Sequence, residues 1–375
     1  MTADEREALL LASFAVRSAG AVRRHAEPLH RYRSAFQRDR DRIVHSAAFR
    51  RLAQKTQVFT GDGHGYHRTR LTHTMEVASI ARTLARALRL NEDLVEALAL
   101  LHDIGHPPFG HAGEDVLDAK LEGVGGFNHN AQALRIVERL EQRYPNFPGL
   151  NLTTDVLDGQ RRRAAGGKRH GPGATLEAQV VEAADSIAYN AHDADDALEI
   201  GLLEFKDLLD AELWASAAEA VDHRHSALDT HQRRRAVVHE LLDVQVGDLL
   251  NATQRRLTEA GFDSPDDARA APPVVGVSAA MQVRKRQLEA LLFERVYRHP
   301  RLLERRDQVK QTLGNAFDEL VRKHDMLPEP YASVAQDEGA ARGVADILAN
   351  LTDDAVLSIK RFDHGAEHGR DFLDV

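Results

Sequence analysis

The stretch Asn91-Glu-Asp-Leu-Val-Glu-Ala-Leu-Ala-Leu-Leu-His-Asp-Ile-Gly105 decides the fold class of this chain. It begins with an asparagine, which caps helices well, and its apolar residues recur at intervals of three and four. A glycine and, soon after, two prolines end the pattern. The stretch therefore predicts a helix that begins after Asn91 and carries His102 and Asp103 in its last turn.

The same helical pattern extends along most of the 375 residues. Alanine, leucine, glutamate and arginine dominate and runs of β-branched residues are scarce, so we expect an all-α protein of one large or two ordinary domains. Apolar periodicity predicts further helices at 72–88, 132–144, 175–200, 211–221, 231–260, 281–296 and 304–324. Two stretches lack this periodicity: 159–173, rich in glycine and arginine, predicts a mobile surface loop, and 263–273 predicts a linker.

Composition excludes several classes of protein. The acidic N-terminus lacks the features of a secretory signal, and no apolar run approaches the roughly 20 residues of a membrane helix. We therefore expect a cytoplasmic protein with no membrane partner. The absence of cysteine leaves only nitrogen and oxygen ligands for a metal, and the net charge of -9 argues against general nucleic-acid coating.

Histidines are concentrated in one segment, since seven of the twenty lie between positions 64 and 129. Four polar residues interrupt apolar faces of predicted helices, namely His73, His102, Asp103 and Asp185. A buried carboxylate is costly unless it is paired or binds a metal, so these groups indicate a shared divalent cation such as Mn, Mg, Fe, Ni or Zn. An alternative stays open, in which the histidines bond to the backbone and the aspartates cap helices or pair with arginines.

Candidates for acid-base chemistry follow directly. His111 and Glu114 are three residues apart, so a helix starting near His111 would place them on one face, where the carboxylate orients the imidazole. His106 and His129 are further candidates for proton transfer or phosphate binding. Each also has a structural interpretation, because His106 could bond a carbonyl at a helix end and His129 lies in a polar cluster that could cap a helix.

The four candidate ligands together resemble the H…HD…D signature of HD-domain phosphohydrolases. Longer strings resemble the deoxyguanosinetriphosphate triphosphohydrolase branch, including Leu-His-Asp-Ile-Gly-His-Pro-Pro-Phe-Gly-His-Ala-Gly-Glu at 101–114. The others lie at 46–59, 68–77, 127–132, 149–153 and 176–193. Beyond residue 200 the likeness thins, and it returns faintly at 291–300 and 345–354, where Leu351 replaces the usual methionine.

The resemblance implies an HD-domain helical bundle with additional C-terminal helices. It divides the chain into an N-terminal helical arm at 1–31, a metal-dependent phosphohydrolase core at 32–205, and a C-terminal region at 206–375 that completes the nucleotide site and oligomer contacts. It also implies a homo-oligomer, either a hexamer or a tetramer.

For function, the resemblance implies hydrolysis of deoxynucleoside triphosphates (dNTPs) at the α-phosphorus, which releases a deoxynucleoside and inorganic triphosphate. The four residues of the signature would hold the metal at the α-phosphate. His111 and Glu114 would transfer protons, with His106 and His129 as the next candidates. The preferred base stays open.

The predicted substrate contacts come from two segments. Arg51 and Arg70 belong to a basic stretch before the 72–88 helix, where guanidinium groups suit phosphate, although such residues could equally be solvated surface charges. Tyr189 and Asp193 follow the candidate ligand of their helix at intervals of four, on the same face. The resemblance implies that Tyr189 packs against the deoxyribose and that Gln54 reads the sugar or base, with Asp193 in a supporting role.

Two other functions stay open. Another HD-type nucleotide phosphohydrolase or phosphodiesterase would share the metal ligands but lack the longer strings. A non-catalytic nucleotide sensor is a second alternative, against which the complete set of ligand and acid-base residues argues. The basic stretch at 161–170 also suggests a nucleotide or single-stranded nucleic-acid effector.

Overall fold

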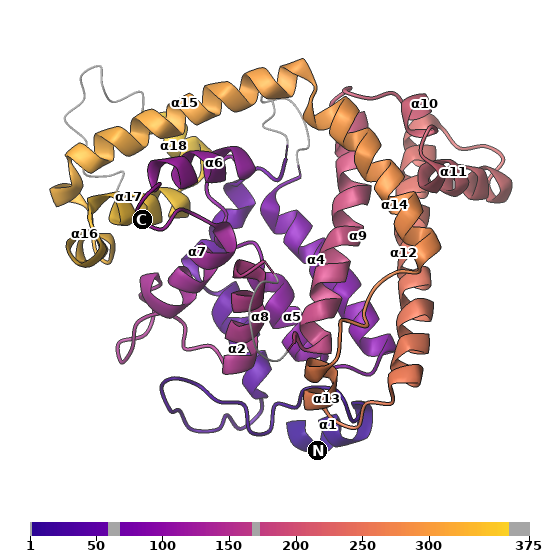
Figure 1. Ribbon diagram of the computed structural model, residues 1–375, viewed down its shortest axis with the longest axis horizontal. Coiled ribbons are helices and arrows are strands. Elements are labelled where there is room, and N and C mark those ends of the chain that lie inside the picture. The colour runs from indigo at the N-terminus through magenta and orange to yellow at the C-terminus, as the bar shows by residue number, and fades with distance from the viewer. Residues whose placement is uncertain (1, 59–67, 167–172, 360–375) are drawn as a thin grey trace. The chain divides into compact units, whose positions relative to one another are not determined.

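The structure, a computed structural model, describes residues 2–58, 68–166 and 173–359. Within these ranges the regular elements are helices, and β-type pairing is confined to two isolated bridges, Arg23 with Thr153 and Thr56 with Thr69 (Figure 1). The prediction of an all-α protein is confirmed. Across the same ranges, no helix is both long and apolar enough to span a membrane.

Segments that are far apart in the sequence gather into two compact units. Of the described residues, the histidine unit, as we name it, draws on 18–58, 68–75, 97–166 and 304–359, and the α9 unit draws on 2–17, 76–96 and 173–303. Helices α4 (Arg70–Ala87) and α5 (Glu92–Leu101) each have residues in both units. The division into three consecutive segments that the resemblance implies stays a prediction.

The α9 unit is built around the long helices α9 and α12, which pack against each other and against α11 and α14 (Figure 1). Besides parts of α4 and α5, its helices are α1 (Ala3–Leu10), α9 (Leu176–Glu199), α10 (Phe205–Leu208), α11 (Glu212–Arg224), α12 (Thr230–Ala260), α13 (Pro265–Ala270) and α14 (Ala279–Leu292), which continues as the π-helical segment η3 (Phe293–Tyr297). The Thr175 side chain caps α9 by accepting a hydrogen bond from the backbone N–H of Ala178. This cap explains why α9 begins where the sequence predicts.

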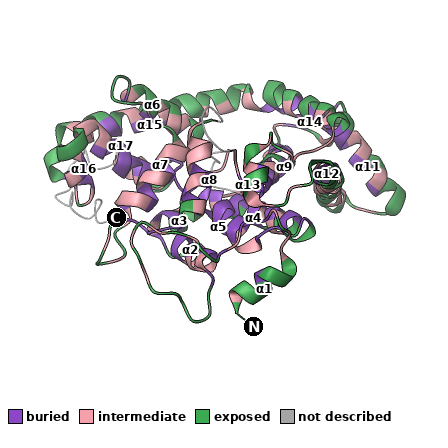
Figure 2. Ribbon diagram, turned by 60° about the horizontal axis from the view of Figure 1, so that its bottom comes forward, coloured by how far each residue is buried: buried purple, intermediate pink, exposed green. Residues whose placement is uncertain are grey.

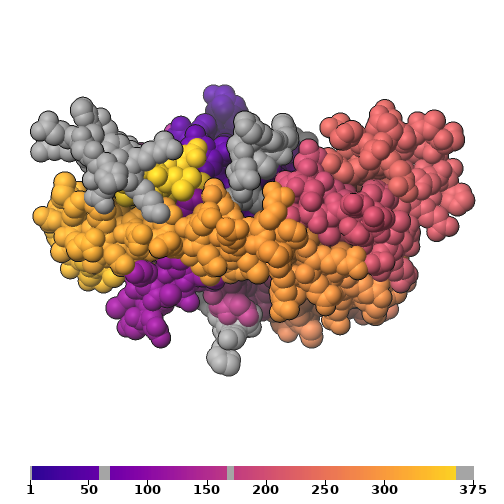
Figure 3. Space-filling model, turned by 90° about the horizontal axis from the view of Figure 1, so that it is seen from above, coloured from indigo at the N-terminus to yellow at the C-terminus, as the bar shows by residue number. Residues whose placement is uncertain are grey.

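The histidine unit holds shorter helices. They are α2 (Ala35–Val44), α3 (Ala47–Arg51), η1 (Leu52–Gln54), α6 (His111–Lys120), α7 (His129–Arg135), the π-helical segment η2 (Ile136–Leu140), α8 (Thr154–Ala164), most of α15 (Pro300–Arg322), η4 (His324–Met326), α16 (Tyr331–Glu338), α17 (Ala340–Asn350) and α18 (Asp353–Ile359). Helix α15 forms part of the outer surface (orange in Figure 3).

Helix α5 is buried along most of its length, as the purple colour in Figure 2 shows. The side chain of Asn91 caps it as predicted, accepting a hydrogen bond from the backbone N–H of Leu94 at 3.2 Å. The helix ends at Leu101, so His102 and Asp103 form the turn after it rather than its last turn. An apolar helix that is buried to its end thus carries two polar side chains into the interior.

Most predicted helices are present with ends that differ by a few residues. The predicted helix at 132–144 differs more, because it begins at His129, where the Asn128 side chain caps it, and ends as η2. The predicted helix at 281–296 likewise closes in a π-helical segment, η3. Local propensity does not distinguish an α-helical turn from a π-helical one.

The prediction of a surface loop at 159–173 is wrong for its first part. Residues 159–164 belong to α8, and Gly159 and Gln160 are buried. A Cβ atom at Gly159 would lie 2.5 Å from the Leu98 side chain, so glycine permits close packing here rather than a turn. Arg161 pairs with Glu138 and Asp158, which balances part of its charge. Residues 167–172 lie outside the described ranges.

The predicted linker at 263–273 contains a helix, α13. Ser264 caps this helix by accepting a hydrogen bond from the backbone N–H of Asp267, and Pro265 occupies its first turn. Proline has no N–H to donate and its fixed φ suits a first helical turn, so here it starts a helix rather than breaking one.

Candidate metal centre and active site

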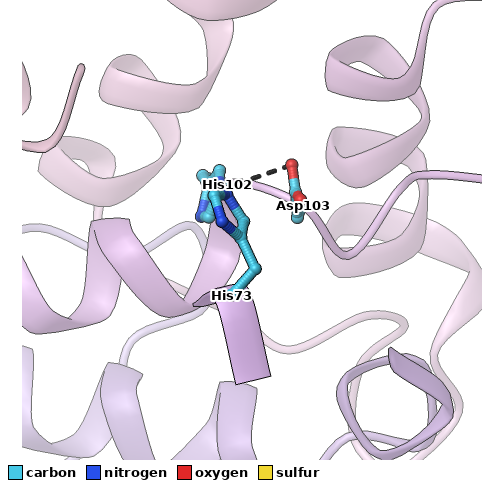
Figure 4. A group of neighbouring side chains, drawn as sticks. All are labelled: His73, His102 and Asp103. Carbon is cyan, nitrogen blue, oxygen red and sulfur yellow. Dashed lines mark ion pairs between the residues drawn. The ribbon is translucent and has the colours of Figure 1, made fainter. Parts of the chain in front are cut away.

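Three buried side chains of the histidine unit converge. His73 comes from the first turn of α4, and His102 and Asp103 come from the turn after α5 (Figure 4). One ligand atom from each lies within 4.8 Å of the other two. Two imidazoles and a carboxylate at this spacing are a donor set that could hold a divalent metal ion.

The His102 ring is held in one tautomer. Its Nδ1 lies 2.6 Å from the carbonyl oxygen of Ala99, and because a carbonyl only accepts, Nδ1 carries the proton. The lone pair is therefore on Nε2, which lies 3.4 Å from Oδ1 of Asp103. A backbone bond at one ring nitrogen is the usual way in which proteins prepare the other nitrogen to bind a metal. The residues present therefore fit a divalent ion.

Asp103 is held as a carboxylate. Burial alone would raise its pKa, but its polar neighbours, among them the Arg70 guanidinium, outweigh burial and lower the pKa well below its usual range. Nη1 of Arg70 lies 2.9 Å from Oδ2 of Asp103. Asp103 is thus ionised at neutral pH, as a metal ligand must be.

Two features expected of ordinary core residues are also present, since His102 bonds to the backbone and Asp103 pairs with an arginine. That interpretation does not explain why a second buried histidine, His73, brings a ring nitrogen to the same point. Convergence of all three groups is what a metal site requires.

Glu114 joins two histidines. Its carboxylate accepts hydrogen bonds from Nδ1 of His111 at 3.1 Å, from Nδ1 of His129 at 2.8 Å, and from the backbone N–H of His129 at 2.9 Å. Burial would raise the pKa of Glu114, but these donors lower it well below its usual range. His111 and Glu114 lie in the first turn of α6 and are three residues apart, the arrangement that the sequence predicts.

His106 lies between this network and the metal centre. Its ring stacks on that of His129 with centroids 3.8 Å apart, and its Nε2 lies 3.4 Å from Oδ1 of Asp103. Burial, then Arg70 and His129, lower the pKa of His106 well below its usual value, so the ring is neutral. The carbonyl bond that the structural interpretation of His106 predicts is replaced by a contact with a carboxylate.

Known protein families and relatives match most of this chain. Residues 70–190 match the HD domain family, and residues 275–361 match the phosphohydrolase-associated domain family. A deoxyguanosinetriphosphate triphosphohydrolase-like protein of Geobacter sulfurreducens is 43% identical over 354 residues, which cover 92% of each chain. A protein of the same name from Azoarcus sp. is 42% identical over 360 residues, 93% of this chain and 95% of its own.

This chain belongs to the deoxyguanosinetriphosphate triphosphohydrolase-like family. The resemblance stated from the sequence strings is thereby confirmed, and the protein is a hydrolase of the HD phosphohydrolase class. The HD match contains all four residues of the signature, while the second match covers the faint C-terminal string at 345–354.

In this chain Arg70 is buried, and its guanidinium already has hydrogen-bond partners within the protein. Its guanidinium donates to Asp103 and, at 3.2 Å, to the backbone carbonyl of Gln57. In this arrangement it orients a candidate metal ligand, and its predicted contact with triphosphate stays a prediction. Arg51 is half-buried in α3 and Gln54 is exposed in η1, and their predicted roles are likewise still to be tested.

The other predicted residues lie on α9, in the α9 unit. Asp185 and Tyr189 are half-buried, and Asp193 is buried and accepts a hydrogen bond from the hydroxyl of Tyr297. The rings of Tyr189 and Tyr297 stack with centroids 6.3 Å apart. Burial first, and then Asp193, raise the pKa of both phenols, which keeps them neutral. This contact supports the structural part that the sequence suggests for Asp193.

Tyr297 and Asp353 escaped the sequence reasoning, and Lys55 was part of the basic stretch before α4, whose residues could equally be surface charges. Tyr297 lies in the faint string at 291–300, which was the available signal for it. Lys55 is buried in the histidine unit, and its ammonium donates to the carbonyl of His106 at 2.7 Å; burial lowers its pKa to about 7. Asp353 lies in the string at 345–354 and contacts the loop before α6.

Proposed function

We propose that this protein hydrolyses dNTPs to a deoxynucleoside and inorganic triphosphate with the aid of a divalent metal ion. The observation that supports the proposal most is the convergence of His73, His102 and Asp103 beside the network of Glu114. The names of the relatives point to the same class of substrate.

His73, His102 and Asp103 would hold the ion, and Asp185 is the fourth ligand in the proposal. When bound, the ion supplies Lewis acidity, which polarises a phosphoryl oxygen and favours deprotonation of water. Mn, Mg, Fe, Ni and Zn all suit a shell of imidazole and carboxylate.

His111 is the proposed proton carrier. Because its Nδ1 donates to Glu114, its Nε2 carries the lone pair, and its side chain is exposed by 67%. Nε2 accepts a proton as water attacks the α-phosphorus, and the bond from phosphorus to the 5′ oxygen breaks. The leaving 5′ oxygen takes a proton from solvent and His111 returns its own proton to solvent, so the products are a neutral deoxynucleoside and triphosphate. His129 holds Glu114 in place, and His106, whose ring is neutral, is the next candidate in the proposal for proton transfer or phosphate binding.

Substrate recognition is assigned by the resemblance. Tyr189 packs against the deoxyribose, Gln54 reads the sugar or base, and Arg51 and Arg70 contact the triphosphate. Asp193 orients Tyr297 against Tyr189. The proposal further includes a cytoplasmic homo-oligomer, a hexamer or tetramer, and a nucleotide or single-stranded nucleic-acid effector.

The test is product analysis. The metal-loaded protein is incubated with each of the four dNTPs in water enriched in ¹⁸O, and the products are separated by ion exchange. Deoxynucleoside and triphosphate are expected, with the heavy oxygen in triphosphate because attack is at phosphorus. Pyrophosphate and monophosphate would indicate another HD phosphohydrolase, and binding without products would indicate a nucleotide sensor.

A further inference from the structure

The string at 345–354 is a family-like string that the proposed function leaves without a role. It spans the end of α17 and the start of α18 (Figure 1), and its Asp353 is buried. The hydroxyl of Thr352, not the carboxylate of Asp353, accepts the hydrogen bond from the backbone N–H of Ala355 that caps α18. The Asp353 carboxylate is directed to partners outside its own helix.

Those partners are two backbone amides from distant parts of the chain. Oδ1 of Asp353 accepts the N–H of Phe109 at 2.9 Å, and Oδ2 accepts the N–H of Thr56 at 3.0 Å. Phe109 lies in the loop between His106 and His111, and Thr56 precedes α4. Bonds from amides to a carboxylate are among the stronger hydrogen bonds, so this contact ties three segments together.

Lys55 binds the same turn from its other end. Its buried ammonium donates to the carbonyl of His106 at 2.7 Å and to the carbonyl of Ala349 at 2.8 Å. The turn from Ala349 to Asp353 is therefore held by the amino group of Lys55 at one end and by its own carboxylate at the other. The two bonds of Lys55 to carbonyl oxygens need only N–H donors, which the amino group has in either protonation state.

The loop before α6 needs such support. Phe109 has φ +62° and Gly110 has φ +58°, so two successive residues adopt left-handed backbone. For phenylalanine this conformation is unfavourable and persists only where neighbours impose it. Gly110 stands at the capping position before α6 and has no side chain that could cap the helix. The direction in which His111 leaves the loop therefore depends on the backbone of Phe109.

We propose that Asp353, together with Lys55, is a positioning residue that fixes the loop at 106–110 and thereby aims His111. Asp353 itself touches no reacting group. The effect of Asp353 on the backbone does not depend on the reaction that the protein catalyses, whereas its effect on turnover rests on the proposed function.

Hydrogen exchange tests the effect on the backbone. In Asp353→Asn the amide group of asparagine presents a donor to one of the two N–H groups, so one bond is lost. We expect the amides of His106, Phe109, Gly110 and His111 to exchange about 10-fold faster or more, with α8 unchanged. Asp354→Asn is the matched control, because Asp354 is the next residue and is exposed. Unchanged exchange at 106–111 would overturn the proposal.

A double-mutant cycle with His111→Ala tests the effect on turnover. We expect Asp353→Asn to lower kcat roughly 10- to 100-fold with little change in KM and in metal content. In the His111→Ala background Asp353→Asn should lower kcat by less than about 3-fold, because the ring that it positions is already absent. If the kcat losses of the two single variants multiplied in the double variant, Asp353 would not act by positioning His111.

If Asp353→Asn folds poorly, a loss of kcat could come from misfolding. Asp353→Glu is therefore the second variant. It keeps the charge, and recovery of exchange protection and kcat above the asparagine variant is expected. Recovery of neither by a stably folded glutamate variant, together with multiplying losses in the cycle, would count against the proposal. If the wild-type protein turns over no dNTP, the proposed function fails, while hydrogen exchange still decides the role of Asp353.

Discussion

Glu114 accepts hydrogen bonds from two imidazoles and one backbone amide, so its charge orients both rings at once. The exposed ring of His111 is the one available to a substrate, and the half-buried ring of His129 stacks on His106. At the scale of single residues, one carboxylate thus determines which nitrogen of His111 carries the lone pair.

Glu114→Gln should lower kcat by roughly 100- to 1,000-fold while KM changes little. The glutamine amide offers one acceptor where two imidazoles need one each, so His111 loses its fixed tautomer. Steady-state kinetics with the preferred dNTP measure the loss. Asp115→Asn is the control, because Asp115 is on the same helix and bonds Arg306 and Lys310 at the surface. Equal losses in the two variants would argue against a specific role for Glu114.

Asp185→Ala should lose bound metal and activity together, because the proposal makes this carboxylate the fourth ligand. Elemental analysis of the purified variant gives the metal content, and His73→Ala serves as the comparison for loss of a ligand. Glu182→Ala, an exposed position one turn earlier on α9, is the matched control. Full metal content in Asp185→Ala would remove Asp185 from the site.

At the scale of elements, the loop after α5 is pressed against the start of α7. A Cβ atom on Gly105 would lie 2.0 Å from the carbonyl oxygen of His129 and 2.4 Å from the backbone nitrogen of Ala133. Only glycine fits there, because backbone atoms cannot be displaced without moving the helix. This contact brings the turn of His102 and Asp103 next to the helix that begins with His129.

Gly105→Ala should therefore destabilise the protein by about 1–3 kcal/mol or more, the typical cost of overpacking. Gly247→Ala is the control, since Gly247 lies within α12 with open space around its Cα. Alanine favours helix, so this variant should gain up to about 1 kcal/mol. Thermal unfolding followed by circular dichroism compares the two. A similar rise in Tm for both variants would show that the loop accommodates the added methyl group without cost, which would contradict the prediction.

At the scale of the whole molecule, buried charge links global stability to pH. Glu177 on α9 is fully buried, and its Oε1 accepts the backbone N–H of Val16 at 2.9 Å and that of Asn91 at 3.3 Å. Burial raises the pKa of Glu177 from 4.5 to about 7, more than the hydrogen bonds and Arg269 lower it. The folded chain thus keeps a proton on Glu177 that the unfolded chain has released.

Because unfolding releases this proton between pH 4.5 and about 7, the contribution of Glu177 to stability falls as pH rises through that window and is constant above it. The slope is on the order of 1 kcal/mol per pH unit. Glu177→Gln keeps an acceptor for both amides and should be more stable than wild type at pH 8. Urea unfolding at pH 5 and pH 8 measures the difference, with Glu182→Gln as control. The same pH dependence in Glu177→Gln and wild type would disprove the link.

The fold class and much of the candidate site were predictable from the order of the amino acids. Periodicity, caps and composition are local properties, so they predicted the all-α fold and the starts of α5, α6 and α9. The spacing of His111 and Glu114 gave their contact for the same reason, because residues three apart on a helix are neighbours. The signature strings gave the family without any geometry.

Which segments meet could be seen only once the chain was folded. The stack of His106 on His129, the salt bridge of Arg70 with Asp103 and the bond from Phe109 to Asp353 join residues 23, 33 and 244 positions apart. Periodicity tells which face of a helix is buried but not which segment covers it. The helix at 159–164 was missed for the same reason, since its glycine is explained by close contact with Leu98 rather than by local propensity.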